Sequence, residues 1–365
     1  MTSVRQIAAS AFSDILSSGG QARQTVRVVA GTLLTFILYH LLNLPQGYWA
    51  VFTVVIVMQG SIGGTLGASI DRMKGTLFGA VVGGFAAWLR PQTPVGLGAA
   101  LAFAVGVTAF FAASRPSLKV APVTAVIMLI SPSGGNLGPI DSALFRVLEI
   151  AIGSVVGVVA SVLIFPARST ALVVTRTRGA LTLMADALEG YADTLDRPDS
   201  LTAHDDAQLR IRTALAGIES AMVDAGREHT SRLGEHLLST ALPRTLWRVR
   251  NDAISVSRAL GPMSEGVAAL ISQPTRALMQ AEADFMRACG TALGEQRRVD
   301  RGEREAKLTA FEAAMGALRQ SRLTHDLSFD AVGRLFGLGF ALESLHRNLT
   351  DLGDRVDEAA KGAPL

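Results

Sequence analysis

Two short apolar segments in the first half of the chain share one pattern. Residues 53–64 read TVVIVMQGSIGG, and residues 124–135 read TAVIMLISPSGG. Each segment begins at a threonine, stays apolar for about two helical turns and ends in small residues with a glycine pair. Short apolar segments that Gly or Pro interrupts at matching places in two halves are typical of the substrate path of a membrane transporter.

The residues that follow the two segments extend the match. An arginine and two glycines recur with the same internal spacing, first at Arg72, Gly79 and Gly83 and again at Arg146, Gly153 and Gly157. Within the segments five of twelve positions are identical, and the second half has three more residues before its arginine. The pattern favours an internal repeat, with coincidence in a biased composition as the alternative.

Long stretches without charge predict membrane-spanning helices. No charged residue lies between Val28 and Ile70, within 91–114 or within 150–167. Crossing a hydrocarbon core of about 30 Å takes a helix of about 20 apolar residues. We therefore expect six spans, at 26–43, 48–60, 73–90, 95–113, 120–132 and 144–165. The second and fifth are short, so they either extend through Gly-rich continuations or break within the membrane, where the backbone lines a cavity or packs on protein.

Charge divides the chain into parts of different solvent class. Residues 1–178 carry 12 Lys and Arg against 4 Asp and Glu, whereas residues 179–365 carry 22 against 27. We expect an N-terminal segment at 1–24, which is either a helix on the membrane surface or a frayed leader, a membrane transporter domain at 25–168 and a soluble domain at 169–365. Because the second part is acidic, the pI of 9.3 does not indicate nucleic acid binding.

The loops between the predicted spans give an orientation. Lys and Arg gather before the first span, between the second and third, between the fourth and fifth, and after the sixth. Such an excess marks the cytoplasm, so both termini and the soluble domain are expected there, with the spans in the cell (inner) membrane. Three spans per half is an odd number, so the halves must insert in opposite orientations. The sequence thus predicts an all-α protein, in which a 3+3 inverted repeat of six transmembrane helices precedes a cytoplasmic helical bundle.

Charged residues at the ends of two spans are the first candidates for a substrate path. Arg72 and Arg146 head the third and sixth spans, so in inverted halves they would lie at opposite mouths of one path. A guanidinium group presents a fork of donors that suits carboxylates; the alternative is a side chain that reaches out to lipid headgroups. Lys74 adds positive charge near Arg72. Glu149 lies one turn after Arg146, as its ion-pair partner or as a proton-coupling carboxylate.

Polar residues on the two short segments extend the candidate path. Their side chains would hold an anion together with backbone amides freed where the helices unwind, or would only form interhelical hydrogen bonds. They are Thr53, Gln59, Ser61, Thr65, Thr124, Ser131 and Asn136. Arg115 and Lys119 either gather anions at the inner face or only mark the topology. Close helix packing is expected at Gly75, Gly79, Gly83, Gly153 and Gly157.

The second half of the chain reads as helix throughout. Apolar residues recur at helical spacing in several stripes, one of them through Leu181, Met184 and Leu188, which predicts an antiparallel bundle. No phosphate-binding loop, acid–base constellation or metal motif is recognisable, so we expect neither an enzyme nor a cofactor. Cys289 is expected to be a small packed hydrophobe.

Two local features of this half carry expectations of their own. The basic cluster around Trp247 is expected to be a solvated face paired with acidic residues, with contact to headgroups or a regulatory anion as the alternative. The prolines are expected to punctuate the helices, at Pro198, Pro243, Pro262 and Pro274.

One part of the membrane domain resembles a known family. Residues 48–84 read YWAVFTVVIVMQGSIGGTLGASIDRMKGTLFGAVVGG. They resemble the signature of the fusaric acid resistance and aromatic acid exporter family, which is distantly similar to plant aluminium-activated malate channels. The pattern is an aromatic-Trp-Ala opening, a Thr-rich apolar span and Arg-x-x-Gly-Thr with recurring glycines, here Tyr48, Trp49, Ala50, Thr53, Arg72, Gly75, Thr76, Gly79 and Gly83. FRVLEIAIGSVVGVVASVLIFPAR at 145–168 resembles the closing span of the family.

The resemblance implies six spans per unit, a cytoplasmic helical domain and export of organic anions, by proton-driven efflux or passive conduction. Many relatives carry two membrane blocks, so a homodimer would replace the fused form here. The expected partners are therefore the lipid bilayer, a small organic anion and a second copy of the chain. A non-transporting membrane-anchored helical scaffold is the alternative function, and a membrane enzyme acting on a lipid ranks third.

Overall fold

The computed structural model describes residues 19–361 except positions 90, 92, 131–138, 196–203, 234–237 and 326. Over this part of the chain every regular element is a helix, which confirms the predicted all-α class. Contacts between Cα atoms divide the chain into two compact units, Met1–Ser169 and Thr170–Leu365. The predictions on Ser131, Asn136 and Pro198, and most of the predicted N-terminal segment at 1–24, lie outside the described residues.

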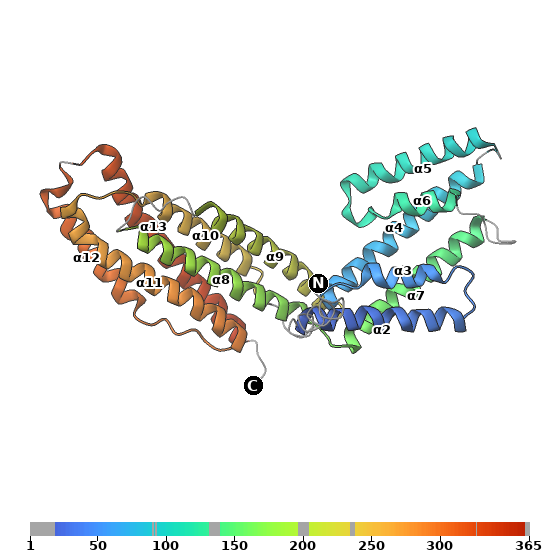
Figure 1. Ribbon diagram of the computed structural model, residues 1–365, viewed down its shortest axis with the longest axis horizontal. Coiled ribbons are helices and arrows are strands. Elements are labelled where there is room, and N and C mark those ends of the chain that lie inside the picture. Colours follow the sequence, from blue (N-terminus) through green and yellow to red (C-terminus); the bar gives the residue numbers. More distant parts are fainter. Residues whose placement is uncertain are drawn as a thin grey trace, which may run out of the picture. The chain divides into compact units, whose positions relative to one another are not determined.

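The described residues of the first unit form six α-helices and one 3-10 turn, and consecutive helices run back and forth in Figure 1. They are α2 (Gly19–Leu41), α3 (Tyr48–Val57), α4 (Ile62–Leu89), α5 (Pro94–Ser114), η1 (Pro116–Leu118), α6 (Ala121–Ile130) and α7 (Pro139–Leu163). Three helices within the described ranges are long and apolar enough to cross a membrane, at Gly19–Leu41, Pro94–Ser114 and Asp141–Leu163.

The other three helices of this unit depart from a simple span. The two short ones, α3 and α6, have 10 residues each, so at 1.5 Å per residue each covers about 15 Å, half of a hydrocarbon core. The long helix α4 has 28 residues but carries Asp71, Arg72 and Lys74, which lower its mean hydropathy. The sequence pattern therefore predicted the short segments well and placed the start of α4 too late by about three turns.

The break between α3 and α4 follows from local chemistry. At Met58 the backbone turns extended, with ψ of 107°, and ends α3. Three residues later Ser61 caps α4, because its Oγ accepts a hydrogen bond from the Gly64 N–H at 3.1 Å and its carbonyl accepts one from Thr65 at 3.0 Å. Gln59 and Gly60 between them favour the non-helical turn.

Each short helix packs on the long helix of the other half. Gly79 of α4 lies against α6, where an added Cβ would collide with the Ala121 carbonyl oxygen and lie 2.8 Å from the Thr124 Cβ. Gly153 of α7 lies against α3 in the same way, with the Ala50 carbonyl and the Thr53 Cβ, also at 2.8 Å, as its neighbours. The absence of a side chain at these glycines is what allows the backbones to approach.

The same correspondence extends to the hydrophobic clusters of the two halves. One cluster contains Val54, Met58 and Ala160. The other contains Ala125, Leu129 and Ala86 at the corresponding positions. Corresponding residues of α3 and α6 differ by 71 in number, and those of α4 and α7 differ by 74. The same two offsets relate the contacts of Gly79 to those of Gly153.

Threonine hydroxyl groups repeat the correspondence on both pairs of helices. Thr53 and Thr124 bond to the carbonyl oxygens four residues earlier, at 2.7 and 3.3 Å. Thr35 of α2 and Thr108 of α5 do the same, at 2.8 and 2.6 Å. Each of these hydroxyl groups donates its hydrogen to a carbonyl of its own helix.

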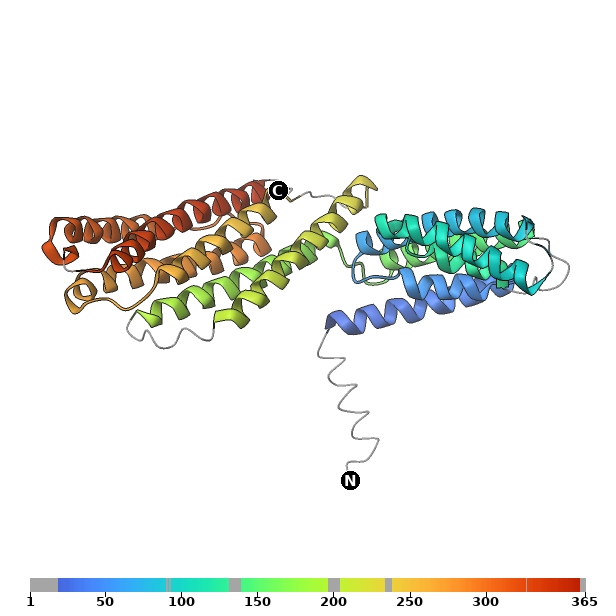
Figure 2. The same ribbon diagram turned by 90° about the horizontal axis from the view of Figure 1, so that it is seen from above.

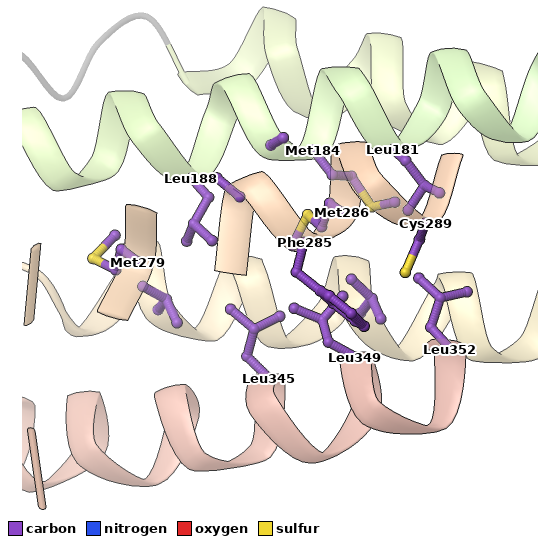
Figure 3. Close-up of a cluster of buried hydrophobic side chains, with 14 of the residues drawn as sticks. Leu181, Met184, Leu188, Met279, Phe285, Met286, Cys289, Leu345, Leu349 and Leu352 are labelled. Atoms are coloured by element: carbon purple, nitrogen blue, oxygen red, sulfur yellow. The ribbon is translucent and has the colours of Figure 1, made fainter. Parts of the chain in front are cut away.

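The second unit is also helical, and its long helices run side by side in Figure 2. They are α8 (Ser169–Thr194), α9 (His204–Thr230), α10 (Leu242–Ala259), α11 (Glu265–Glu295), α12 (Arg304–Gln320), η3 (Arg322–Thr324) and α13 (Phe329–Lys361). Leu181, Met184 and Leu188 of α8 point into a core that α11 and α13 share, as Figure 3 shows. The predicted apolar stripe is therefore a core face.

The prolines of this unit behave in two ways. Pro243 stands in the first turn of α10, and Pro262 lies between α10 and α11, as expected for helix punctuation. Pro274 lies inside α11, so the expectation that it ends a helix is wrong. A helix of 31 residues that is packed along its length tolerates one lost backbone hydrogen bond. Pro198 lies outside the described residues.

Candidate functional site

Buried arginines are the most unusual feature of the first unit. Arg146 of α7 and Arg27 of α2 are each 2% exposed, and Arg72 of α4 is 8% exposed. Charged side chains inside a membrane are rare, because placing an arginine at the centre of a span costs about 2.5–3.5 kcal/mol on the translocon scale. The sequence pattern indicated Arg72 and Arg146 as site residues. It did not indicate Arg27, which contributed only to the predicted orientation of the spans.

Arg146 lies in a cage formed by an aromatic ring and an amide, although its Nε is buried without a hydrogen-bond partner. Its guanidinium carbon lies 4.0 Å from the centre of the Trp49 ring, and its Nη2 donates to the Gln46 Oε1 at 3.2 Å. The Gln46 backbone N–H in turn donates to the Glu149 Oε1 at 2.8 Å. Gln46 thus links Arg146 to Glu149, and nothing in the sequence pattern singled it out.

The ion pair expected between Arg146 and Glu149 is not formed. The two residues interact electrostatically, but no nitrogen–oxygen pair between them lies within the 4.0 Å of a salt bridge. Glu149 is 0% exposed, and its second oxygen, Oε2, has no hydrogen-bond partner. A buried carboxylate oxygen without a partner is costly while the group is ionised.

Arg72 has the opposite surroundings. Its Nε is buried without a hydrogen-bond partner, and no ion pair joins it to the neighbouring Asp71. Glu149, Trp49 and Gln46 correspond to Gly75 of the first half and to Val120 and Ser117 of the second. Gly75 lies against these last two residues, because a Cβ added to it would lie within 3.5 Å of the Ser117 carbonyl oxygen and the Val120 Cβ. Arg72 therefore lacks the acid, the ring and the amide that surround Arg146.

Arg72 lies further along its helix than the sequence predicted. It follows the first residue of α4 by ten positions, about 15 Å, because α4 begins earlier than predicted. Arg146 is within electrostatic range of Arg72. That the two arginines mark opposite mouths of one path stays a prediction.

The other predicted cations and amides lie on the surface. Lys74, Arg115 and Lys119 are exposed. Gln59 is exposed as well, and its Nε2 donates back to the Ile56 carbonyl at 3.2 Å. The structure therefore separates these residues from the buried pair of arginines.

The start of α4 is not open for an anion. The amides of its first turn all have acceptors, because Ile62 bonds to the Ala167 carbonyl at 3.1 Å and Gly63 bonds to the Ser169 Oγ at 3.2 Å. Ser61 satisfies the next two amides, and Thr65 uses its own hydroxyl for the Gln59 N–H and the Ser61 carbonyl. The backbone amides of Gln59 and of Ile62 to Thr65 are therefore occupied.

The described residues of the second unit form many ion pairs. The cluster around Trp247 is paired, because the Trp247 Nε1 donates to Glu219 at 2.7 Å and Arg248 contacts Asp351; this agrees with the expected solvated face. Cys289 is buried, and burial raises the pKa of its thiol to about 12, so it is a packed and unreactive group. Within the described residues, no group of three metal-ligating side chains occurs.

The apolar helices with arginines buried among them define an integral membrane protein. Residues 32–160 match the model of a family described as fusaric acid resistance protein-like. The inner membrane protein YeeA of Escherichia coli (strain K12) is 31% identical over 135 residues, which make up 35% of this chain and 36% of YeeA. Residues 32–160 thus match a fusaric acid resistance protein-like domain, which agrees with the family expected from the sequence. The match spans about a third of the length of YeeA.

Proposed function

We propose that this protein transports organic anions across the inner membrane and that Arg72 binds the carboxylate of the substrate. The observation that carries the proposal is the contrast between two buried arginines at corresponding positions. The guanidinium group of Arg146 lies over the Trp49 ring, donates to Gln46 and has Glu149 nearby, and its Nε alone is buried without a partner, whereas Arg72 makes no hydrogen bond to the described residues. A buried guanidinium group without a partner is costly, and a carboxylate would relieve that cost through charge-assisted hydrogen bonds.

The six helices form two triplets of opposite orientation in this proposal. Matching contacts of Gly79 and Gly153 and of the two hydrophobic clusters support the repeat. An odd number of helices per triplet makes the repeat inverted, and such repeats place the substrate near the bilayer midplane. The path runs between α3, α4, α6 and α7, beside Arg72.

Glu149 is the group that would couple transport to protons. It is fully buried, one of its oxygens has no partner, and it connects through Gln46 to Arg146. Intramembrane carboxylates of this kind are typical of proton relays. We propose proton-coupled export over passive conduction on this observation.

The remaining parts of the proposal concern topology and assembly. The distribution of Lys and Arg supports cytoplasmic termini, and hence a cytoplasmic second unit. A homodimer is the transporting form in this proposal. A scaffold that conducts nothing is the second candidate, and it has no use for an unpaired cation at Arg72.

Flux of phthalate into proteoliposomes tests the proposal. Phthalate is an aromatic acid with two carboxylates, so its ionised form crosses a bare bilayer slowly. We expect the wild type to take up phthalate. The uptake rate of Arg72→Ala should be at least about tenfold lower, because the variant loses a charge-assisted hydrogen bond to the substrate that is worth about 1.5–3 kcal/mol.

Arg23→Ala is the matched control, because Arg23 is an exposed arginine of the same unit. It should transport phthalate at the wild-type rate. Equal rates for wild type, Arg72→Ala and empty liposomes, with a panel of aromatic and dicarboxylic acids, would favour the scaffold.

A further inference from the structure

A second buried polar pair lies near the start of α2, apart from the cage of Arg146. Arg27 is 2% exposed, and its Nε and Nη1 have no hydrogen-bond partner. Gln24, one turn earlier, has a buried Oε1 that is also unpartnered. Three polar atoms on one face of one helix are thus removed from solvent and left unsatisfied, which is rare for a buried site.

The pair lies beside the end of α3. The Gln24 Nε2 donates to the Met58 carbonyl at 3.3 Å. Gly31, one turn after Arg27, lies against Val54 and Met58, where an added Cβ would be 3.1 and 3.0 Å from their side chains. The two polar residues therefore face the point at which α3 stops and its last carbonyl groups have no helical partners.

The other half of the unit shows that the fold does not require polar residues here. The offset of 73 positions that relates Thr35 to Thr108 relates Gln24 to Leu97 and Arg27 to Ala100. Ala100 is a buried member of the second hydrophobic cluster, and Leu97 packs against that cluster. An apolar pair occupies these positions in one triplet without loss of packing, so the arginine and glutamine of the other triplet serve something besides packing.

We propose that Arg27 and Gln24 form a second anion site, which binds an oxyanion, a carboxylate or a phosphate group, at the end of α3. The free Nε and Nη1 of Arg27 donate to two oxygens of the ligand, as a guanidinium fork does. The Gln24 Oε1 accepts from a hydroxyl of the ligand or from a water molecule that the ligand retains.

Two sources supply this chemistry. One is a free organic anion. In that case the inference rests on the proposed function, and the substrate binds at Arg27 before it reaches Arg72. The other is the headgroup of an anionic phospholipid, which would bind at the same guanidinium group. The experiment below separates the two sources, and it reads binding and not transport.

The test measures the thermal unfolding of the full chain in nanodiscs of phosphatidylcholine, with phthalate or inorganic phosphate added. The variants are Arg27→Ala and Gln24→Leu, which copy Ala100 and Leu97, with Arg23→Ala as the control. Arg72→Ala serves as the background in which the first site is removed. We expect phthalate to raise the unfolding temperature of Arg72→Ala, and the half-saturating concentration to rise about tenfold or more when Arg27→Ala is added.

The outcomes distinguish the alternatives. A shift that only phosphatidylglycerol in the nanodisc produces, and that Arg27→Ala removes, identifies a headgroup as the ligand. A shift that is the same with and without Arg27→Ala for phthalate, phosphate and phosphatidylglycerol overturns the proposal. If Arg27→Ala does not fold, Gln24→Leu alone must weaken binding, and unchanged binding in that variant overturns the site equally.

This result is independent of the outcome for transport. Binding that depends on Arg27, without any phthalate flux in the wild type, would end the proposed function and leave the second site. Flux that depends on Arg72, without binding at Arg27, would support the proposed function and overturn the second site.

Discussion

At the scale of single residues, the surroundings of a charge decide what it does. Arg146 has a ring, an amide and a nearby carboxylate, and it acts as a structural cation between α3 and α7. Arg72 has none of these partners. The same residue type at two corresponding places thus has two roles, and the difference lies in three neighbours contributed by other parts of the chain.

The cage of Arg146 predicts a loss of stability when its ring is removed. Trp49→Leu should lower the free energy of unfolding by about 1–2 kcal/mol, because a desolvated cation–π contact contributes roughly this amount beyond its area. Thermal unfolding in detergent measures the change. Trp88→Leu, at a tryptophan that is 73% exposed, is the control and should differ little from wild type. Equal losses in both variants would contradict the structural role of Trp49.

Glu149 allows a test of proton coupling. Glu149→Gln keeps an oxygen for the Gln46 N–H but removes the group that binds a proton. Phthalate flux driven by a pH gradient should fall to the rate without a gradient, while flux driven by a phthalate gradient continues. A variant that still responds fully to the pH gradient would exclude Glu149 as the coupling group.

The residue scale is also where sequence reasoning was weakest. Arg72 and Arg146 could be found because their spacing from the glycines repeats. Gln46 and Arg27 could not, because Gln46 lies in a loop and Arg27 lies at the edge of a span, where a cation usually marks only topology. Their burial depends on how α2 and α3 pack, which one sequence does not reveal.

At the scale of elements, the two halves of the first unit interlock through glycines. Gly79 and Gly153 hold the short helices against the long ones, and the repeated small residues that indicated these contacts are visible in the sequence. Gly79→Ala should destabilise the protein by about 1–3 kcal/mol, because the new methyl group would collide with the Ala121 carbonyl.

Gly84→Ala provides the control for this change on the same helix. No atom lies within 4 Å of its added Cβ, so the variant should match the wild type or gain up to about 1 kcal/mol from its better helix propensity. Unfolding midpoints of the two variants measure the difference. Indistinguishable midpoints for Gly79→Ala and Gly84→Ala would contradict the packing described here.

Some helix boundaries could be predicted from the sequence pattern and others could not. The break after α3 follows from Gly and Ser and was predicted, whereas the predicted break after α6 lies outside the described residues. The early start of α4 was not predicted, because Asp71, Arg72 and Lys74 resemble the charges of a loop when they are read without their neighbours. In α11, packing over 31 residues overrides the signal of Pro274.

At the scale of the whole molecule, the two units rest on different forces. In the first, apolar helices carry buried cations; in the second, a large core lies beneath a surface of ion pairs. Arg287 of α11 illustrates the second kind, because it bonds to Glu189 of α8 at 2.6 and 2.5 Å and to Asp186 at 2.7 Å. The hydrogen bonds from Arg287 hold the pKa of Glu189 below its ordinary value.

This pair gives a pH dependence with a definite sign. Because the folded-state pKa of Glu189 is lowered, its contribution to stability is complete above the ordinary pKa of the carboxyl group and is lost as the pH falls through the lowered value. Arg287→Ala should therefore destabilise the protein more at about pH 7 than at about pH 3. Urea unfolding at both pH values checks this. A loss that does not change with pH would show that Arg287 acts through packing alone.

Arg72 is proposed to bind the carboxylate of the substrate through its positive charge. The decisive measurement is phthalate flux in variants of Arg72 that keep or remove this charge. Arg72→Lys keeps a positive charge, whereas Arg72→Gln keeps hydrogen-bond donors without a charge. The account predicts that Arg72→Lys retains saturable flux with a raised half-saturating concentration and that Arg72→Gln and Arg72→Ala lose it. Saturable flux at the wild-type rate in Arg72→Gln, with the protein folded, would contradict the account.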